Sequence, residues 1–350
     1  MLYFNYIPNP EETMQNKSFV QWIVVFLLIV SMVGQASSVS AASSKASYEY
    51  YVVGNPDNAT GSTTAGQLLM GGGTDVDAAF QWMIGKAGGG DFVVIRASGT
   101  DAYNPYIYDF GGIDSVATII TKNRAAASDS FVVDKIRNAE ALFIAGGDQN
   151  DYVTLWKGTP IEDAIHYLVS RNVPIGGTSA GLAVMGEFLF SAANGTIYSD
   201  TALSNPYNKK VALDRDFLVL PYMGGIITDS HFVTRDRMGR LVTFLARIVQ
   251  DGWAPTAKGI GIDEQTAIAV EANGTATVLG FGAAYFLRTP GQPEVCQPKT
   301  ALTYRNLSVY RVSGSATFNF GTWSGNGGTA YTISSESGVL TSTQAGGGIY

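Results

Sequence analysis

The stretch over residues 173–187, VPIGGTSAGLAVMGE, constrains the fold more than any other part of this chain. Its apolar start predicts a buried strand, its glycines a tight turn, and its small apolar end the start of a helix. Ser179 lies at the turn within GTSAG, the G-x-S-x-G pattern of a nucleophile elbow. Such a turn holds the serine at the end of a sheet, where the free N–H groups of the helix face negative charge on an attacked carbonyl. An ordinary glycine-rich turn between a strand and a helix is the alternative interpretation.

Short apolar strands alternate with helical stretches through most of the chain. We expect strands at 48–53, 92–95, 115–120 and 141–145, and helices at 75–85 and 160–170. This alternation predicts an α/β fold with a mostly parallel sheet and helices on both faces. In such sheets the sites lie beyond the carboxyl ends of the strands, where the elbow and the GGDQ stretch (146–149) both fall.

Composition changes near both ends of the chain. Residues 22–34 form an uncharged apolar run between Lys17 and small residues that end at Ala41, which predicts a signal peptide. The run is short for a membrane span, and an uncleaved anchor is the alternative. Past residue 300, short strands and turn residues dominate. We therefore divide the chain into a signal peptide (1–41), an α/β domain (42–300) and a β-rich C-terminal extension packed on that domain (301–350).

The charge and the scarcity of cysteine and histidine exclude several classes of function. A net charge of −7 argues against nucleic acid as a partner, because phosphate binding requires a basic face. Two histidines and one cysteine leave no cluster for a metal, so we expect none. The glycine runs at 71–73 and 88–90 lack the G-x-G-x-x-G spacing of a dinucleotide site, and we expect no cofactor. The cysteine, Cys296, lies in a Pro/Gly-rich segment and is interpreted as incidental.

A nucleophilic serine needs a base, and histidine is the usual one. His166 lies off the apolar stripe of the helix expected at 160–170, which favours a solvated position. His231 comes before a stretch of helical periodicity that starts at Met238. We expect it just before that helix, where the helix dipole disfavours an imidazolium and keeps the base neutral. A capping histidine is the alternative.

The third member should be a carboxylate that orients the imidazole. The strand-like GIGIDE stretch (259–264) ends in Asp263 and Glu264, and side-chain alternation directs only one of them toward the site. Physical reasoning leaves that choice open. Asp229 is a third candidate, although a residue only two positions before His231 in the sequence reaches its imidazole with difficulty. For the oxyanion, the natural backbone donors are Ala180, next after the serine, and Gly147 in the neighbouring glycine turn.

Three arginines follow His231 closely. Arg237 and Arg240 share a face if the segment is helical, and Arg235 lies nearby. An arginine near the serine would bind a substrate carboxylate, with two hydrogen bonds where the geometry allows. A solvated helix face that includes Asp236 explains the same residues equally well.

Four motifs in order resemble the cyanophycinase branch of the peptidase E-like serine peptidases (peptidase family S51). They are FIAGGDQ (143–149), GTSAG (177–181), DSHF (229–232) with the arginines that follow, and GIGIDE (259–264). The resemblance runs from about residue 53 to the end of the sequence. It implies a fold similar to the class I glutamine amidotransferases and a triad of Ser179, His231 and Glu264. It also implies that residues 42–300 are a serine peptidase domain and that substrate is held by Gln149, Asp229, Arg235 and Arg237.

The substrate implied by the resemblance is cyanophycin, a poly-aspartate chain with arginine on each side-chain carboxyl, cut to β-Asp-Arg dipeptides. The chain departs from the family at Ser230, where glutamine is usual, and at Leu182, where alanine is frequent. We expect a secreted serine-type peptidase that forms an acyl-enzyme on a peptide or polymer substrate. We expect no nucleic acid partner and no stable membrane association after signal cleavage. The sequence leaves open whether the protein forms a homodimer. The alternatives are a secreted serine esterase or amidase of other specificity, and a non-catalytic binding protein on the same scaffold.

Overall fold

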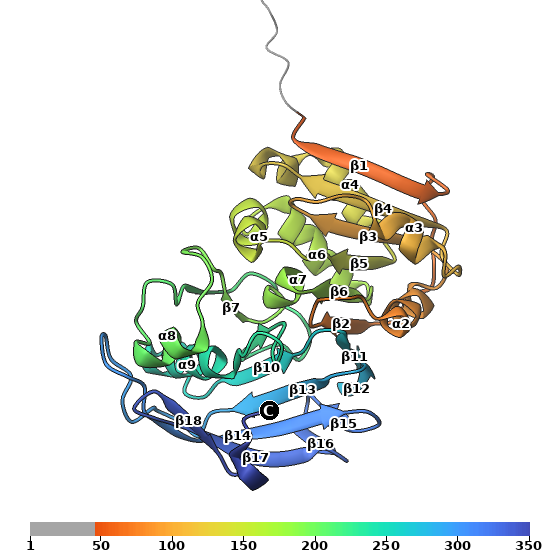
Figure 1. The fold of residues 1–350 in the computed structure, drawn as a ribbon. Coiled ribbons are helices and arrows are strands. Elements are labelled where there is room, and N and C mark those ends of the chain that lie inside the picture. Colours follow the sequence, from red (N-terminus) through yellow and green to blue (C-terminus); the bar gives the residue numbers. More distant parts are fainter. Residues whose placement is uncertain (1–45) are drawn as a thin grey trace, which may run out of the picture. The chain divides into compact units, whose positions relative to one another are not determined.

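The computed structural model describes residues 46–350. The signal peptide predicted over 1–41 lies outside the described residues. Within 46–350 the strands form two sheets of ten and eight strands (Figure 1). The first sheet runs in the order β1-β4-β3-β5-β6-β2-β11-β12-β15-β16, and the second in the order β18-β17-β14-β13-β10-β9-β7-β8.

The strands of the first sheet, in spatial order, are β1 (Tyr48–Gly54), β4 (Ser115–Thr121), β3 (Asp91–Arg96), β5 (Ala141–Ile144), β6 (Ile175–Thr178), β2 (Gly66–Met70), β11 (Thr266–Glu271), β12 (Thr275–Gly280), β15 (Thr317–Asn319) and β16 (Ser324–Asn326). Those of the second sheet are β18 (Val339–Ser342), β17 (Thr329–Glu336), β14 (Tyr304–Ser313), β13 (Ala283–Arg288), β10 (Lys258–Ile262), β9 (Ile226–Asp229), β7 (Phe188–Phe190) and β8 (Leu213–Arg215). The helices are α2 (Asp77–Ala87), α3 (Tyr103–Tyr108), α4 (Ser130–Arg137), α5 (Gln149–Trp156), α6 (Pro160–Ser170), α7 (Ala180–Ala183), α8 (Ser199–Ser204) and α9 (Met238–Gln250), with 3-10 turns η1 (Arg124–Ser128) and η2 (Ala345–Gly347).

Both sheets are mixed, and the expectation of a mostly parallel sheet is wrong. Strands β4, β3, β5, β6 and β2 are parallel neighbours. At one edge of this block, β1 pairs antiparallel with β4. At the other edge, β11 pairs antiparallel with β2, and β12, β15 and β16 follow in antiparallel order. In the second sheet only the contacts of β9 with β10 and β7 are parallel. The sequence showed the alternating block and the short strands after residue 300, but not how the added strands pair.

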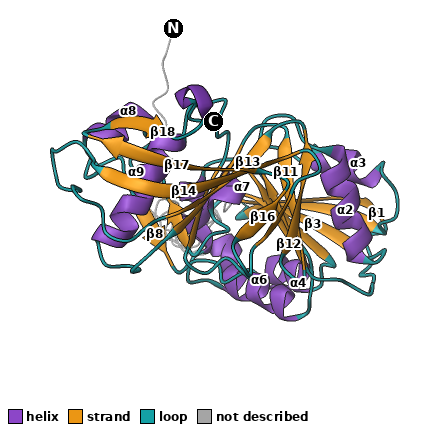
Figure 2. Ribbon diagram, turned by 90° about the horizontal axis from the view of Figure 1, so that it is seen from below, coloured by secondary structure: helices purple, strands orange, loops and turns teal. Residues whose placement is uncertain are grey.

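Helices cover both faces of the parallel block, as expected. On β3, Phe92 and Val94 pack with α2 and α3, whereas Val93 and Ile95 pack with α4, α5 and α6. Successive side chains of a strand point to opposite faces, so a strand buried on both faces is apolar throughout. Figure 2 shows α2 and α3 on one side of these strands and α4 and α6 on the other.

The residues after 300 extend both sheets. Strands β14, β17 and β18 continue the second sheet from β13, and β15 and β16 continue the first from β12. Phe318 on β15 stacks on Phe286 of β13 with ring centroids 3.7 Å apart, and both rings are buried. The division of the chain at residue 300 stays a prediction. Among residues 46–350, no helix combines the length and apolar character that crossing a membrane would require.

We predict that Phe143→Ala destabilises the fold strongly. Phe143 is fully buried on β5, with its ring centroid 4.9 Å from that of Phe80 and 5.6 Å from that of Tyr103. Truncation leaves a cavity at the centre of this aromatic cluster, and we expect a loss of about 3–5 kcal/mol in urea unfolding. Phe281→Ala is the control, because that side chain is 93% exposed, and its effect should stay within about 0.5 kcal/mol. Equal effects for the two variants would contradict the assignment of Phe143 to the core.

Candidate active site

Ser179 occupies a strained turn between β6 and α7. Its backbone has φ 53° and ψ −112°, a conformation that L residues rarely adopt. The turn is close-packed: a Cβ at Gly181 would collide with the backbone of Ile144, and one at Gly177 would lie 2.7 Å from the backbone of Gly181. The glycines of the elbow are therefore required by close backbone approach. The helix that follows is only four residues long, so donors for an oxyanion are local N–H groups and not the dipole of a long helix.

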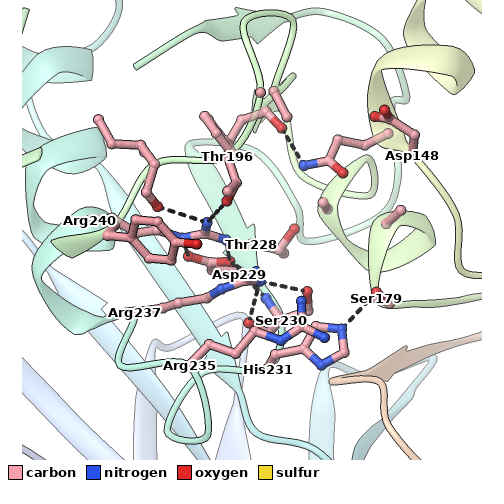
Figure 3. Close-up of a pocket in the computed structure, with 18 of the residues that line it drawn as sticks. Asp148, Ser179, Thr196, Thr228, Asp229, Ser230, His231, Arg235, Arg237 and Arg240 are labelled. Carbon is pink, nitrogen blue, oxygen red and sulfur yellow. Dashed lines mark hydrogen bonds and ion pairs between the residues drawn. The ribbon is translucent and has the colours of Figure 1, made fainter. Parts of the chain in front are cut away.

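The hydroxyl, imidazole and carboxylate predicted to act together lie in contact. Ser179 Oγ is 2.8 Å from Nε2 of His231, and Nδ1 of His231 is 2.5 Å from Oε1 of Glu264 (Figure 3 shows the first of these contacts). Because a carboxylate only accepts, Nδ1 carries the proton and Nε2 is free to accept from the serine. This arrangement fits a serine activated by a base whose ring is oriented by an acid.

Asp263, the alternative acid, faces a different group. Its Oδ1 accepts hydrogen bonds from the backbone N–H of Val233 (3.0 Å) and of Thr234 (2.9 Å), and from the Thr234 hydroxyl (3.0 Å). It thereby fixes the turn that follows His231. Of the two acids, Glu264 contacts the imidazole of His231 and Asp263 contacts the turn after it. Both lie past Ile262, the last residue of β10, and the role of Glu264 stays a prediction.

A glycine loop after β2, residues 71–73, forms the floor beneath these three side chains. The carbonyl of Gly71 accepts from the N–H of His231 (2.8 Å). Gly72 has φ +92°, and a Cβ there would lie 2.6 Å from Cε1 of His231 and 3.1 Å from Cβ of Ser179. A Cβ on Gly73 would lie 3.0 Å from that of Glu264. Sequence reasoning tested this GGG run only as a dinucleotide motif and missed its role; its position directly after a buried strand was the available signal.

A pocket of about 340 Å³ opens beside Ser179. Its lining includes every site residue predicted from the sequence except Glu264. The missed part of the lining is the connection from β7 to α8, which contributes Ala192, Gly195, Thr196, Ile197 and Tyr198. No motif marks this connection in the sequence. Asp148 was also missed, although it lies within the GGDQ stretch. It caps α5 by accepting from the N–H of Asn150 (2.9 Å).

The predicted substrate residue Asp229 is the centre of a buried ion cluster. Its carboxylate accepts from Arg240 (Nε to Oδ2, 2.7 Å; Nη2 to Oδ1, 2.5 Å) and from Arg237 (Nη1 to Oδ1, 3.4 Å). Asp229 and Arg240 are each about 3% exposed. Arg240 also donates to Thr196 Oγ1 and to the carbonyl of Ile197 at 3.3 Å, which ties β9 to the missed connection (Figure 3). The carboxylate is therefore already bound to two guanidinium groups.

The remaining predicted residues line the pocket in different environments. The side chain of Arg235 is half exposed and lies 3.7 Å from Oε1 of Glu264. Burial lowers the pKa of Arg237 to about 10, so its guanidinium stays charged at neutral pH. Gln149 donates from Nε2 to the carbonyl of Phe190 (3.2 Å). Ala180 is buried and Gly147 is exposed, and both border the same cavity as the serine.

The expectation that a helix dipole keeps His231 neutral is wrong. Helix α9 begins only at Met238, and His231 lies in the turn that follows β9. Burial is the main cause that holds the pKa of His231 below its ordinary value, and the cations of Arg235 and Arg237 lower it further. The hydrogen bond to Glu264 acts in the opposite direction. Desolvation thus favours the neutral form of the ring.

The sequence assigned no catalytic role to His166 or Cys296, and the structure shows what surrounds each of them. His166 accepts at Nε2 from the backbone N–H of Val219 (3.0 Å), which joins α6 to the segment before β9. Cys296 is buried, and burial raises the pKa of its thiol to about 12. Within residues 46–350, no three His, Cys, Asp or Glu side chains cluster in a way that could hold a metal ion.

The comparisons with known proteins agree on one family. The model of peptidase family S51 matches residues 109–278, a range that contains Ser179, His231 and Glu264. A cyanophycinase of Synechococcus elongatus is 31% identical over 173 residues, which cover 49% of each chain. These matches support a cyanophycinase-like member of peptidase family S51. A cyanophycinase of a Nostoc species is 27% identical over 212 residues, 59% of this chain and 66% of the relative.

The match spans about half the length of the Synechococcus relative. Among solved structures, a peptidase from an acI-B1 Actinobacterium is similar with a TM-score of 0.49 and 17% identity, covering 67% of this chain and 95% of that chain.

We predict that Gly72→Ala disables Ser179 without unfolding the protein. The added Cβ would displace the imidazole from the serine, and we expect labelling of Ser179 by a fluorophosphonate to slow about tenfold or more. Gly89→Ala is the matched control, because Gly89 also has positive φ (+82°) but no heavy atom lies within 4 Å of the added Cβ. Both variants should lose about 1–3 kcal/mol of stability from backbone strain. Equal labelling rates in the two variants would show that the floor does not position His231.

We predict that Arg235→Gln moves the acid limb of the pH–rate profile for fluorophosphonate labelling of Ser179 to higher pH. A nearby cation destabilises the imidazolium and lowers the pKa of His231, so removal of Arg235 lets that pKa rise. The measurement is the fluorophosphonate labelling rate between pH 4 and 9, at low and high salt, since salt should reduce the shift. Arg305→Gln, an exposed arginine paired with Glu336, is the control. An acid limb that stays in place or moves to lower pH contradicts the electrostatic argument.

Proposed function

We propose that this chain is a serine peptidase that hydrolyses β-linked aspartyl peptides through an acyl-enzyme, with cyanophycin as its substrate. The observation that carries the proposal is the unbroken hydrogen-bonded path from Ser179 Oγ through the imidazole of His231 to Glu264. The match to peptidase family S51 and similarity to cyanophycinases support the choice of reaction and substrate.

The mechanism assigns one task to each side chain. Ser179 Oγ attacks the carbonyl carbon while its proton passes to Nε2 of His231, and Glu264 holds the imidazolium that forms. The backbone N–H groups of Ala180 and Gly147 are assigned to the oxyanion. Collapse of the tetrahedral intermediate breaks the C–N bond, and the amine leaves with the proton from His231. Water then gives a proton to His231 and its oxygen to the acyl carbon, which releases the acid and restores the serine hydroxyl.

The charges around the pocket suit a substrate that carries both signs. Each cyanophycin repeat has a carboxylate and a guanidinium on its arginine. Arg235 and Arg237 supply cations on one wall, and Asp148 supplies an exposed carboxylate near α5, apart from the arginines (Figure 3). We assign Arg235, Arg237 and Gln149 to substrate binding. Asp229 takes part by holding the guanidinium of Arg237.

Ser230 is the site's departure from the family pattern. It is buried, and its carbonyl and hydroxyl accept from Nη1 of Arg237 at 2.9 and 3.3 Å. The serine thus contributes to the orientation of Arg237, and it presents no amide to a substrate. We propose that this substitution changes substrate preference and leaves the chemistry of the triad intact.

The proposal includes three further parts that rest on the sequence. We propose export of the protein through the signal peptide over 1–41, a serine peptidase domain at 42–300 with a β-rich extension at 301–350, and a fold relationship to the class I glutamine amidotransferases.

We predict that Ser179→Ala lowers the release of β-Asp-Arg from cyanophycin by at least about 10⁴-fold with the fold intact. The assay is mass spectrometry of the products, with circular dichroism as the check on folding. Ser191→Ala is the control, because Ser191 is buried near the same cavity and its hydroxyl contacts the carbonyl of Ala212 and the N–H of Ala193, neither of which belongs to the candidate site. It should keep wild-type rates.

The same assay separates the competing classes of function. Rapid hydrolysis of a simple ester with no action on cyanophycin or β-aspartyl dipeptides would replace the proposal with a serine esterase or amidase. A Ser179 that resists fluorophosphonate in the wild-type protein would indicate a non-catalytic binding protein. A Ser179→Ala variant with wild-type rates would end the mechanism.

A further inference from the structure

The segment that carries the base and two of the site arginines, residues 231–238, is here called the arginine loop. It contains left-handed residues near both ends, His231 (φ 47°) and Asp236 (φ 46°). Three backbone hydrogen bonds close turns within the loop. The N–H groups of Arg235, Asp236 and Arg237 donate to the carbonyls of His231 (3.0 Å), Val233 (3.0 Å) and Phe232 (2.9 Å), respectively. Left-handed conformations are costly for residues other than glycine, so the loop depends on outside contacts to keep its shape.

The first half of the arginine loop has three such supports. The carbonyl of Gly71 accepts from the N–H of His231, and the carbonyl of Ile262 accepts from the N–H of Phe232 (3.1 Å). The carboxylate of Asp263 accepts from the N–H groups of Val233 and Thr234. These contacts fix the base and the residues directly after it. They do not reach the residues that place Arg237.

The second half is held by Tyr350. Its hydroxyl donates to Oδ1 of Asp236 (2.8 Å) and accepts from the backbone N–H of Met238 (3.0 Å). It therefore contacts the residues directly before and after Arg237. Its ring packs edge to face on Phe232 and Tyr285, with centroids 5.8 Å apart in both pairs. Ser199 Oγ also donates to the carbonyl of Asp236. The side chains of Arg235 and Arg237 make the contacts with Glu264, Asp229 and Ser230 described above.

Tyr350 is itself tied to the second sheet. The hydroxyl of Tyr331 on β17 donates to the carbonyl of Ile349 (3.0 Å), and Gln344 donates from Nε2 to the carbonyl of Gly348 (2.7 Å). Burial raises the pKa of the Tyr350 hydroxyl, so it stays protonated and can donate to Asp236. The segment 344–350 therefore forms a connection from β17 to the arginine loop.

We propose that Tyr350 is a positioning residue for the candidate active site, which fixes Asp236 and Met238 so that Arg237 reaches Asp229 and Ser230. This gives part of the β-rich segment after residue 300 a task in substrate binding. The effect on kinetics rests on the proposed function, in which Arg235 and Arg237 bind substrate. The effect on the conformation of the arginine loop does not depend on it.

The test compares Tyr350→Phe with Tyr207→Phe. Both variants keep the ring and remove a hydroxyl that donates to an aspartate beside α9: Tyr350 to Asp236 before the helix, and Tyr207 to Asp251 after it (2.7 Å). We expect faster hydrogen–deuterium exchange of amides 235–240 in Tyr350→Phe only. We also expect its KM for cyanophycin to rise about three- to tenfold, as loss of one hydrogen bond predicts, with kcat changed less than about twofold. A merely structural role would leave KM in place and lower the melting temperature of both variants alike.

The outcomes decide the proposal in either direction. Unchanged exchange of amides 235–240, or faster exchange with an unchanged KM, overturns the positioning role. A wild-type protein that does not turn over cyanophycin or β-aspartyl dipeptides defeats the proposed function instead. In that case the exchange of these amides and the fluorophosphonate labelling rate of Ser179 decide the positioning role, and both must differ from Tyr207→Phe for it to stand.

Discussion

The site depends on a hydrogen bond that joins two sheets. Ser179 follows β6 of the first sheet, whereas His231 follows β9 of the second, and their side chains meet at 2.8 Å. Glu264 lies in the connection where the chain passes from β10 in the second sheet to β11 in the first. The glycine loop after β2 fills the space between them, and it has no side chains because backbone and imidazole already occupy that volume. The geometry of the three groups is therefore a property of how the sheets pack, and of no single motif.

Much of the first sheet and of the site was predictable because the signals were local. Strands β3, β4 and β5 are short apolar runs, and α6 has a clear apolar stripe, so their bounds agree with expectation to within a residue. The G-x-S-x-G pattern located the elbow, and the scarcity of histidine pointed to His231. The choice of Glu264 over Asp263 came from the family resemblance, since two adjacent acids at a strand end look alike until the neighbouring turn is known.

The rest was not predictable because it depends on contacts distant in sequence. The first sheet is mixed because β1 pairs antiparallel at one edge of the parallel block and β11, β12, β15 and β16 follow antiparallel at the other. The sequence of a strand does not state which partner it will pair with. Helix α9 begins at Met238, as the periodicity indicated, but the turn over 232–237 separates it from His231. Desolvation, which depends on what covers the ring, favours the neutral imidazole instead. The β7–α8 connection has no sequence signature at all, although the ion cluster around Asp229 reaches it through Arg240.

The crossing of the chain at Glu264 has a consequence for folding. A nascent chain that has completed β6 already holds the nucleophile in its turn, yet its base and acid lie on segments that are made later and pair within another sheet. Contacts between segments far apart in the sequence form late, because the entropy of closing long loops must be overcome first. We therefore expect the serine to become reactive only once the two sheets have docked, so that a partly folded chain holds the serine without its base.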